Sequence, residues 1–354
     1  MVIREFSCVN FRNYRELFLN FSDGFNLFFG ENGQGKSNLV EAIYFALQLE
    51  SFRTNRLRPL IKNGETIGLL QAKIEKDGIS RKTRIEISSA GRKVWLDEAP
   101  VKRASEYITE FYGVVFNPES LYLYRRFAAV RRSLFDRFLA IGSPEYLEKI
   151  RAFRTVLSQK NRLLKQRDFS SLEAWNSLFV EKGHGIIEKR EKFSQTINEI
   201  LPACYERLSG RAGRLVLNYN PSLRGDRKAM MEEVGGLAER ELLAGYALRG
   251  PHRDDFRMSL GGQNGEEMFS QGEFRISHLA VKMALAAVIG DTMGSLPVVI
   301  LDDPLSELDA TVGDHILQYL FEIPNQIFLT ATHPLPRVEA QAARIMEIRE
   351  GRVS

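Results

Sequence analysis

The segment at residues 30–37, Gly-Glu-Asn-Gly-Gln-Gly-Lys-Ser, carries the complete pattern G-x-x-x-x-G-K-[ST] of a phosphate-binding loop. The apolar run at residues 25–29 predicts a buried strand before it, and apolar residues at helical spacing over residues 39–47 predict a helix after it. Glycines let successive backbone N–H groups face inward, and the helix N-terminus adds its positive dipole end. We therefore expect this segment to bind phosphate, in preference to a glycine-rich turn that binds nothing.

Two side chains of the loop indicate the kind of phosphate ligand. Lys36 supplies a point charge suited to the β and γ phosphates of a nucleotide. The Ser37 hydroxyl is placed to ligate the Mg²⁺ that bridges those phosphates. The sequence thus predicts a site for a nucleotide together with Mg²⁺.

The composition limits the class of protein. With 354 residues, 44% of them hydrophobic and 27% charged, the chain has the length and composition of a soluble protein of two or three domain-sized units. No apolar run approaches the roughly 20 residues that span a bilayer, and the first residues form no signal region, so we expect a cytoplasmic protein with no membrane partner. Cys8 and Cys204 lie in apolar settings, which predicts reduced core thiols. The net charge of +4 permits a polyanion partner without requiring one.

The spacing of apolar residues predicts an α/β protein with a helical insertion. Alternation predicts two or three strands in the first 29 residues, an antiparallel meander over residues 67–101 and a short buried strand at 113–116. Helical spacing takes over from about residue 118 to 210, and strand patterns return at residues 215–219 and 256–260.

An acidic strand end in the second half supplies what the phosphate loop lacks. The apolar run at residues 297–301 predicts a buried strand, and Asp302 and Asp303 follow it directly. Taken alone, the two acids are equally well explained as the start of a loop. With a phosphate loop upstream, the first carboxylate suits the Mg²⁺ shell and the second suits a base for the attacking water.

A second candidate anion site opens the helix predicted after residue 269. Ser270, Gln271, Gly272 and Glu273 bring a hydroxyl, backbone N–H groups and a helix dipole to one point, although Ser270 by itself is best explained as a helix cap. The order of the motifs favours a signature role for Ser270 instead. The phosphate loop is followed by a long insertion, residues 270–273, the acidic strand, residues 306–309 and a strand that ends at His333. This order resembles that of the ATP-binding-cassette ATPases. In that class the signature serine and glycine complete the nucleotide site of the partner subunit, so a head-to-tail dimer encloses two ATP molecules.

Six motif segments lie at residues 10–14, 30–37, 51–54, 250–255, 270–272 and 301–309. Together they resemble the bacterial RecF recombination-mediator family. The helical insertion is short, whereas chromosome-maintenance proteins with similar heads carry a long coiled coil. The resemblance implies an ATP-binding-cassette head, a mixed sheet with helices, formed by residues 1–117 and 241–354, with a helical lobe and its basic arm at residues 118–240.

The resemblance also implies a function and its partners. These are an ATP-dependent DNA-binding protein of recombinational repair and replication-fork maintenance, an ATP-driven homodimer on double-stranded or gapped DNA, and cooperation with RecR and RecO in loading RecA. Weak, DNA-stimulated ATP hydrolysis would reset the dimer. The implied metal ligands are Ser37 and Asp302, the catalytic residues Asp303 and His333, and the nucleotide-binding residues Arg12, Asn13, Asn32, Gly33, Gly35, Lys36, Ser37, Asn38, Asn117, Ser270, Gln271, Gly272 and Asp309.

Three positions depart from the expected motifs. Asn117 stands where many cassette ATPases have a glutamine that senses Mg²⁺, and Asp303 stands where they have a longer glutamate base, so we expect slow hydrolysis. Residues 128–130 lack the Gly-x-Pro turn that often precedes the family's paired arginines. His333 fits the switch histidine of cassette ATPases, and a simple turn residue before Pro334 remains the alternative.

Basic residues supply the candidate DNA contacts. Salt-sensitive binding that is indifferent to base sequence is expected, because such residues contact phosphates. A solvated helix face explains the basic run after residue 118 equally well. The candidates are Arg53, Arg56, Arg58 and Lys62 on the ATPase lobe, and Arg131, Arg132, Lys160 and Arg162 on the helical lobe.

Two other functions compete with the resemblance. A nucleotide-binding subunit of a membrane transporter would share the motifs, although the basic helical insertion argues against it. A DNA clamp that binds ATP without turnover would share them too, and Asp303 is the residue on which that distinction depends.

Overall fold

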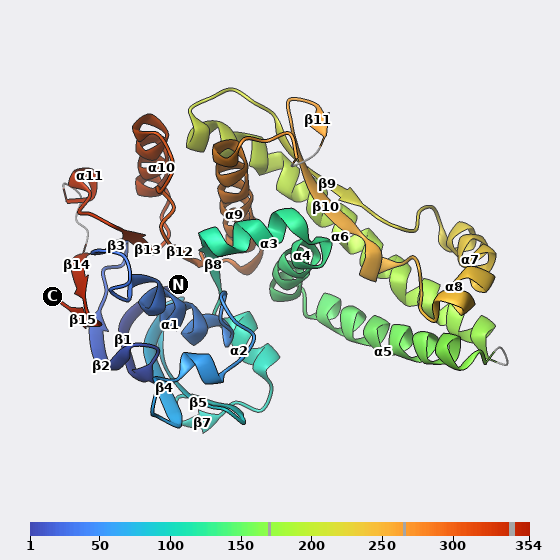
Figure 1. The fold of residues 1–354 in the computed structure, drawn as a ribbon, viewed down its shortest axis with the longest axis horizontal. Helices are drawn as coiled ribbons and strands as arrows, with labels where there is room; N and C mark the ends of the chain where they lie inside the picture. Colours follow the sequence, from blue (N-terminus) through green and yellow to red (C-terminus); the bar gives the residue numbers. More distant parts are fainter. Residues whose placement is uncertain (169–170, 265–266, 340–343) are drawn as a thin grey trace. The chain divides into compact units, whose positions relative to one another are not determined.

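The computed structural model describes residues 1–168, 171–264, 267–339 and 344–354. Its contacts divide the chain into unit 1, residues 1–122, 203–212 and 270–354, and unit 2, residues 123–202 and 213–269. The α/β head with an inserted helical unit, expected from the sequence, is the observed architecture (Figure 1). Unit 2 extends to Phe269, beyond the expected boundary at residue 240, because two strands on either side of that boundary pair with each other.

The motif-bearing strands of unit 1 form a mixed sheet in the order β15-β14-β3-β13-β12-β8. All neighbours from β14 to β8 are parallel, and β15 adds an antiparallel edge. Strands β3, β8, β12 and β13 are short and almost wholly buried, which is typical of a parallel sheet covered on both faces. The strands are β3 (Phe25–Phe29), β8 (Gly113–Phe116), β12 (Val298–Leu301), β13 (Ile327–Ala331), β14 (Arg344–Arg349) and β15 (Arg352–Val353).

A second sheet of unit 1 is antiparallel, in the order β2-β1-β4-β5-β6-β7. The predicted meander is confirmed, and Leu70, Ile74 and Ile85 alternate into the core from its strands. The strands are β1 (Val2–Phe11), β2 (Tyr14–Asn20), β4 (Ile67–Lys76), β5 (Ile79–Ser88), β6 (Gly91–Leu96) and β7 (Ala99–Pro100).

Helix α1 (Lys36–Gln48) joins the two sheets into one core. Its residues from Leu39 to Gln48 are buried, and Val40 and Ile43 belong to one apolar cluster with Phe6 of the antiparallel sheet and Phe28 of the mixed sheet. The helix that follows the phosphate loop is therefore held on two sides. The short helices η1 (Arg58–Leu60) and α2 (Ala104–Glu110) complete this part of unit 1.

Helix α9 (Gln271–Met293) is the central helix of the C-terminal part of unit 1 and lies next to β8. Among the described residues it alone is long and apolar enough to cross a membrane, but 78% of that stretch is buried inside the protein, as in the core helix of a globular domain. The remaining helices of this part are α10 (Ala310–Glu322) and α11 (Pro336–Glu339).

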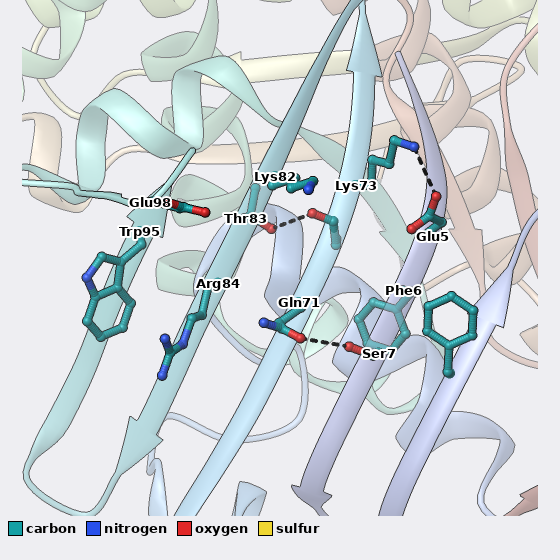
Figure 2. A pocket seen from close by; sticks show the side chains of 12 residues that line it. Glu5, Phe6, Ser7, Gln71, Lys73, Lys82, Thr83, Arg84, Trp95 and Glu98 are labelled. Atoms are coloured by element: carbon teal, nitrogen blue, oxygen red, sulfur yellow. Dashed lines mark hydrogen bonds and ion pairs between the residues drawn. The ribbon is translucent and has the colours of Figure 1, made fainter.

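An open pocket of about 610 Å³ lies on the outer face of the antiparallel sheet (Figure 2). Strand register places Phe18, Ser7, Gln71, Arg84 and Trp95 in one row across five strands. The Arg84 guanidinium lies 5.1 Å from the centre of the Trp95 ring. None of the predicted motif residues lines this pocket, so it is separate from the site described below.

Unit 2 combines long helices with a small sheet in the order β11-β10-β9. Helix α3 (Pro118–Arg126) begins in unit 1, and the last residues of α6 (Leu172–Ser209) return to it. Residues 169–170 of the predicted helical stretch lie outside the described residues. The other elements are α4 (Ala128–Gly142), α5 (Pro144–Gln166), β9 (Leu215–Asn220), α7 (Arg227–Gly236), α8 (Ala238–Ala244), η2 (Pro251–Arg253), β10 (Asp255–Leu260) and β11 (Gln263–Asn264).

A buried ionic cluster centres unit 2. Arg190 of α6, 2% exposed, donates from Nη2 to Asp136 Oδ2 at 2.9 Å and from Nη1 to Asp254 Oδ2 at 2.8 Å. Asp254 also accepts hydrogen bonds from the Tyr219 hydroxyl and from the backbone N–H of Ser222. Removing one partner of such a cluster leaves a buried charge uncompensated, so these residues fix how α4, α6 and β9 meet.

Both cysteines are buried and free, as predicted. Burial raises the pKa of the Cys8 thiol to about 12. A thiol with so high a pKa carries almost no thiolate at neutral pH, so it behaves as a small core side chain.

We predict that His252 makes the free energy of unfolding of unit 2 decrease as the pH is lowered below 6.5. Burial against Phe153 and Phe179 lowers the pKa of His252 from 6.5 to about 4. Between those values the unfolded chain binds the proton and the folded chain does not, so acidification favours unfolding by about 1 kcal/mol per pH unit.

The measurement is urea unfolding from pH 7 to 4, followed by Trp175 fluorescence in a Trp95→Phe background. His252→Gln should flatten the pH dependence of the unfolding free energy in this window. The exposed His333→Gln is the control and should leave the slope unchanged. An equal slope in His252→Gln and the parent would refute the assignment.

Candidate nucleotide-binding site

The parallel strands of unit 1 bring four predicted motifs to one edge of the sheet. The phosphate loop follows β3, Thr332 and His333 follow β13, Asp302 and Asp303 follow β12, and Asn117 follows β8 (Figure 1). These strands are neighbours in the order β3-β13-β12-β8, and the carboxyl ends of parallel strands face the same way. Segments as far apart in the chain as the phosphate loop and His333 therefore converge.

The phosphate loop is held tightly from behind. Gly30 has a φ of 145°, and a Cβ there would lie 2.3 Å from the Ile348 carbonyl oxygen. Gly35, at the N-cap of α1 with a φ of 115°, would place a Cβ 2.6 Å from Asn13 Nδ2. The Tyr14 hydroxyl donates to the Gly35 carbonyl oxygen at 3.0 Å. Both glycines are thus required by close approach of the backbone as well as by conformation.

Lys36 lies in the mouth of this loop with 8% of its surface exposed. Its Nζ donates to the carbonyl oxygens of Gly30 at 2.5 Å and Glu31 at 2.8 Å. Burial lowers the pKa of Lys36, and the nearby carboxylates of Asp303 and Asp302 oppose that shift. An ammonium has three donors, so a phosphate oxygen in the loop can accept the third.

Ser37 and Asp302 come together as predicted for a metal site. The Ser37 hydroxyl donates to Asp302 Oδ1 at 2.9 Å, and the Thr330 hydroxyl donates to the same oxygen at 2.8 Å. Burial raises the pKa of Asp302, while these two hydrogen bonds lower it. A divalent cation next to this carboxylate would supply the missing positive charge.

The donor set fits Mg²⁺ in a nucleotide complex. Hydroxyl and carboxylate oxygens are the ligands that Mg²⁺ prefers, and it is usually held by one or two side chains plus phosphates and water. Among the described residues there is no cluster of three or more acidic, histidine or cysteine side chains that would form an all-protein metal cage. Ser37 and Asp302 would hold the ion only together with a bound nucleotide.

Asp303 adopts a left-handed conformation with a φ of 49°, and its backbone N–H donates to Thr330 Oγ1 at 2.9 Å. Thr330 therefore orients both acids of the strand end. Its role was missed in the sequence, although a threonine near the carboxyl end of the strand beside the acidic strand is a usable signal. The predicted action of Asp303 as a base remains a prediction.

Asn117 is 1% exposed, and its side-chain Oδ1 has no hydrogen-bond partner. It directly follows Phe116, whose carbonyl oxygen accepts the backbone N–H of Asp302 at 2.9 Å. A buried amide oxygen without a partner is costly and is usually satisfied by water, an ion or a ligand. This supports the predicted place of Asn117 beside the metal.

Arg12 supports the loop helix and does not point its donors at the loop. Its Nε and Nη2 donate to the two carboxylate oxygens of Glu41 at 2.8 and 2.7 Å, and Nη1 donates to the Pro59 carbonyl oxygen at 2.9 Å. Glu41 is fully buried in α1. In this structure Arg12 is therefore a structural partner of α1, and its contact with a nucleotide remains a prediction.

Asn13 and Asn38 form the flank of the loop. Asn38 Nδ2 donates to Asn13 Oδ1 at 2.8 Å, and Arg53 Nη1 donates to Asn38 Oδ1 at 2.8 Å. Asn32 and Gly33 are exposed at the loop tip, and His333 is exposed after β13. Their assigned contacts depend on bound nucleotide and stay predictions.

Ser270 and Asp309 are exposed helix caps. Ser270 and Glu273 form a capping box at the start of α9, with Glu273 N–H donating to Ser270 Oγ at 3.2 Å. Asp309 Oδ1 accepts the N–H of Val312 at 2.9 Å at the start of α10. The capping function is thus observed within the chain, and action of Ser270, Gln271, Gly272 and Asp309 across a dimer remains a prediction.

The structure corrects two of the candidate DNA contacts. Arg131 is 2% exposed and forks onto Asp255, with Nε–Oδ1 at 2.7 Å and Nη2–Oδ2 at 2.8 Å. Lys160 is fully buried, with Nζ 2.8 Å from Glu241 Oε2. Neither side chain can reach a phosphate, because each is enclosed as an internal ion-pair partner.

The other candidates differ in how far they are engaged. Arg132 is half-buried and donates to the Asp254 carbonyl oxygen at 2.5 Å, and Lys62 donates to the Asn13 carbonyl oxygen at 2.9 Å. Arg56, Arg58 and Arg162 are exposed, and Arg53 is exposed in part, since it donates to Asn38 and lies 3.6 Å from Glu119 Oε2. The exposed side chains remain the candidates for DNA contact.

We predict that Thr330→Val raises the Mg²⁺ concentration needed for half-maximal ATP hydrolysis by about 10-fold or more, in line with the loss of other residues that orient a metal ligand. Valine keeps the shape of threonine but removes the donor to Asp302 and the acceptor for the Asp303 N–H. Thr330→Ser retains the hydroxyl and should stay near wild type in the same Mg²⁺ titration. Equal Mg²⁺ requirements for the valine and serine variants would contradict this role.

Comparison with known proteins extends the match to the whole chain. The family model described as RecF/RecN/SMC N terminal domain matches residues 2–352. The DNA replication and repair protein RecF of Geotalea daltonii is 32% identical over 354 residues, with 97% of each chain covered. The protein of the same name from Bacillus cytotoxicus is 33% identical over 344 residues, covering 94% of this chain and 92% of its own.

Solved structures agree with the sequence relatives. The recombination mediator protein RecF-ATP in the RecFOR pathway superposes with a TM-score of 0.87 at 25% identity, covering 99% of this chain and 96% of that one. The Smc head domain of Pyrococcus furiosus, at 18% identity and a TM-score of 0.61 over 99% of this chain and 95% of its own, shares the fold. Relatives that match almost from end to end leave one assignment: the chain belongs to the RecF family of ATPases.

Proposed function

We propose that this protein binds ATP with Mg²⁺ and acts as an ATP-dependent DNA-binding protein in recombinational repair and replication-fork maintenance. The observation that carries the proposal is the 2.9 Å contact between Ser37 Oγ and Asp302 Oδ1. It joins the phosphate loop to the acidic strand end in the arrangement that a Mg²⁺-nucleotide complex needs. The relatives named DNA replication and repair protein RecF and recombination mediator protein RecF-ATP support the same function.

Hydrolysis is proposed to be weak and stimulated by DNA. Asp303 stands near Lys36 and has a shorter side chain than the glutamate base of many cassette ATPases, so it would reach the attacking water less readily. Lys36 would neutralise charge on the β and γ phosphates, and Ser37 and Asp302 would hold Mg²⁺. His333 would contact the γ-phosphate end of the site.

ATP is proposed to close a homodimer. Ser270 and Asp309 are exposed at the starts of α9 and α10, where a nucleotide bound to a second copy can reach the helix N-termini. Slow hydrolysis would then open the dimer. A transporter subunit is not favoured, because the relatives that match almost the whole chain are named DNA replication and repair proteins.

The proposed partners are double-stranded and gapped DNA together with RecR and RecO, in the cytoplasm, for the loading of RecA. Exposed arginines on both units, Arg53, Arg56, Arg58 and Arg162, supply the phosphate contacts in this proposal. Binding through phosphates should be indifferent to base sequence and sensitive to salt.

The first test is the oligomeric state. Mg-ATP should shift the protein from monomer to dimer on gel filtration, and Ser270→Arg should abolish the shift because a bulky cation fills the place of the cap at the start of α9. Ser89→Arg, in the exposed turn between β5 and β6, is the matched control and should still dimerise. A wild type that stays monomeric in Mg-ATP, or a Ser270→Arg protein that dimerises normally, would refute the proposed mechanism.

The second test is DNA binding. The double variant Arg56→Ala, Arg58→Ala should weaken binding to duplex and gapped DNA of any sequence and reduce the slope of log K against log[salt] by about 2. Lys93→Ala, an exposed cation on β6, is the control and should keep the wild-type slope. Titrations with single-strand, duplex and gapped DNA, with and without Mg-ATP, supply the measurement; an unchanged slope in the double variant would remove this loop from the DNA surface.

A further inference from the structure

A buried arginine connects the start of α9 to the acidic strand end. Arg275 lies in the second turn of α9, five positions after Ser270, and is 6% exposed. Its Nη2 donates to the carbonyl oxygen of Asp303 and to Ser306 Oγ, the latter at 2.7 Å. Its Nη1 lies 3.5 Å from Glu307 Oε2. One guanidinium thus bridges the helix that carries the signature and the segment at residues 303–307.

The segment that Arg275 holds is conformationally strained. Asp303 has a φ of 49° and Glu307 a φ of 63°, and non-glycine residues in this left-handed region cost roughly 1 kcal/mol or more each. Asp303 also precedes Pro304, which further restricts its backbone. Such a conformation persists only where surrounding contacts hold it, and the Arg275 donor on the Asp303 carbonyl is one of those contacts.

Burying the Arg275 guanidinium inside the protein costs free energy. Burial lowers its pKa, and its Nε is buried with no hydrogen-bond partner. An apolar side chain at this place in α9 would fill the space without a buried charge. The cost of the guanidinium is therefore consistent with a role that an apolar residue cannot supply, namely donating to the backbone of the strand end.

The same region of α9 lies next to the segment that leads to Asp309. A Cβ on Gly272 would lie 4.0 Å from Leu308 Cδ2, so the first turn of α9 and the residues before α10 are neighbours. Movement of the first turn of α9 would consequently be passed to residues 303–309 by packing and through Arg275.

We propose that Arg275 is a positioning residue that couples the two nucleotide sites of the dimer. This inference rests on the proposed function, in which Ser270 of one copy engages the ATP bound to the other copy. Engagement at Ser270 would shift the start of α9, and Arg275 would transmit that shift to Asp303 of its own chain, which faces that chain's own nucleotide. ATP in one site would then set the catalytic geometry of the second.

The test compares Arg275→Gln with wild type in ATP hydrolysis as a function of ATP concentration. The variant is expected to lose about 10- to 100-fold in kcat, the effect of a slightly misplaced catalytic group, with KM changed by less than about threefold. The Hill coefficient is expected to exceed 1 in wild type and to be lower in Arg275→Gln, because the coupling through α9 is lost while ATP-linked dimerisation remains. ATP-dependent dimerisation should persist, since Ser270 is intact.

Further variants separate positioning from general damage. Arg275→Lys keeps a charge and a donor and should recover part of kcat, and Ser306→Ala should lower the Hill coefficient in the same direction. Arg337→Gln, which removes an exposed arginine paired with Asp314 at 3.0 Å, is the matched control and should behave as wild type. A wild-type Hill coefficient in Arg275→Gln, or in Arg275→Lys and Ser306→Ala if the glutamine variant does not fold, overturns the inference.

The outcome is distinct from failure of the proposed function. If wild type neither dimerises with ATP nor hydrolyses it, the proposed function fails. If wild type dimerises and hydrolyses ATP with a Hill coefficient of 1, or if the Arg275 variants keep full cooperativity, only the coupling role of Arg275 fails.

Discussion

The nucleotide site depends on one short contact between distant parts of the chain, the hydrogen bond from Ser37 to Asp302. Ser37 lies at the start of α1 and Asp302 follows β12, a strand of the parallel sheet. Because α1 packs between the two sheets of unit 1, the position of Ser37 is fixed. Thr330, on the strand between them, adds the second donor to the same carboxylate oxygen. The strand order β3-β13-β12 is what brings Ser37, Thr330 and Asp302 together.

Most charged residues near this edge serve the scaffold. Glu41, fully buried in α1, accepts hydrogen bonds from Arg12 and from the Ser51 hydroxyl. The bond from Arg12 links the turn between β1 and β2 to α1. Buried ion pairs add little net stability compared with apolar packing but penalise any arrangement that separates the partners. Here they make the position of the phosphate loop specific.

Residue patterns predicted the contact of Ser37 with the acidic strand because strand, loop and helix signals are local. They left Ser270 open between a cap and a signature residue, and the structure shows the cap, since a single chain cannot display a function that needs a second copy. The basic run predicts Arg131 and Lys160 as DNA contacts because such a run does not reveal which side chains face inward. Their partners Asp255 and Glu241 lie far along the sequence. The roles of Arg275 and Thr330 could not be predicted from the sequence for the same reason, because they depend on contacts with residues that are distant in the chain.

The position of β3 in the sheet has a consequence for synthesis of the protein. This early strand is flanked by β13 and β14, and Asn26 bonds the backbone of Ile327, 301 residues away. Gln34 of the phosphate loop in turn accepts the backbone N–H groups of Glu350 and Gly351. Since chains leave the ribosome N-terminus first, the loop emerges early yet lacks its neighbours until the last strands appear. The nucleotide site would therefore be completed only after β13 and β14 have left the ribosome and paired with β3.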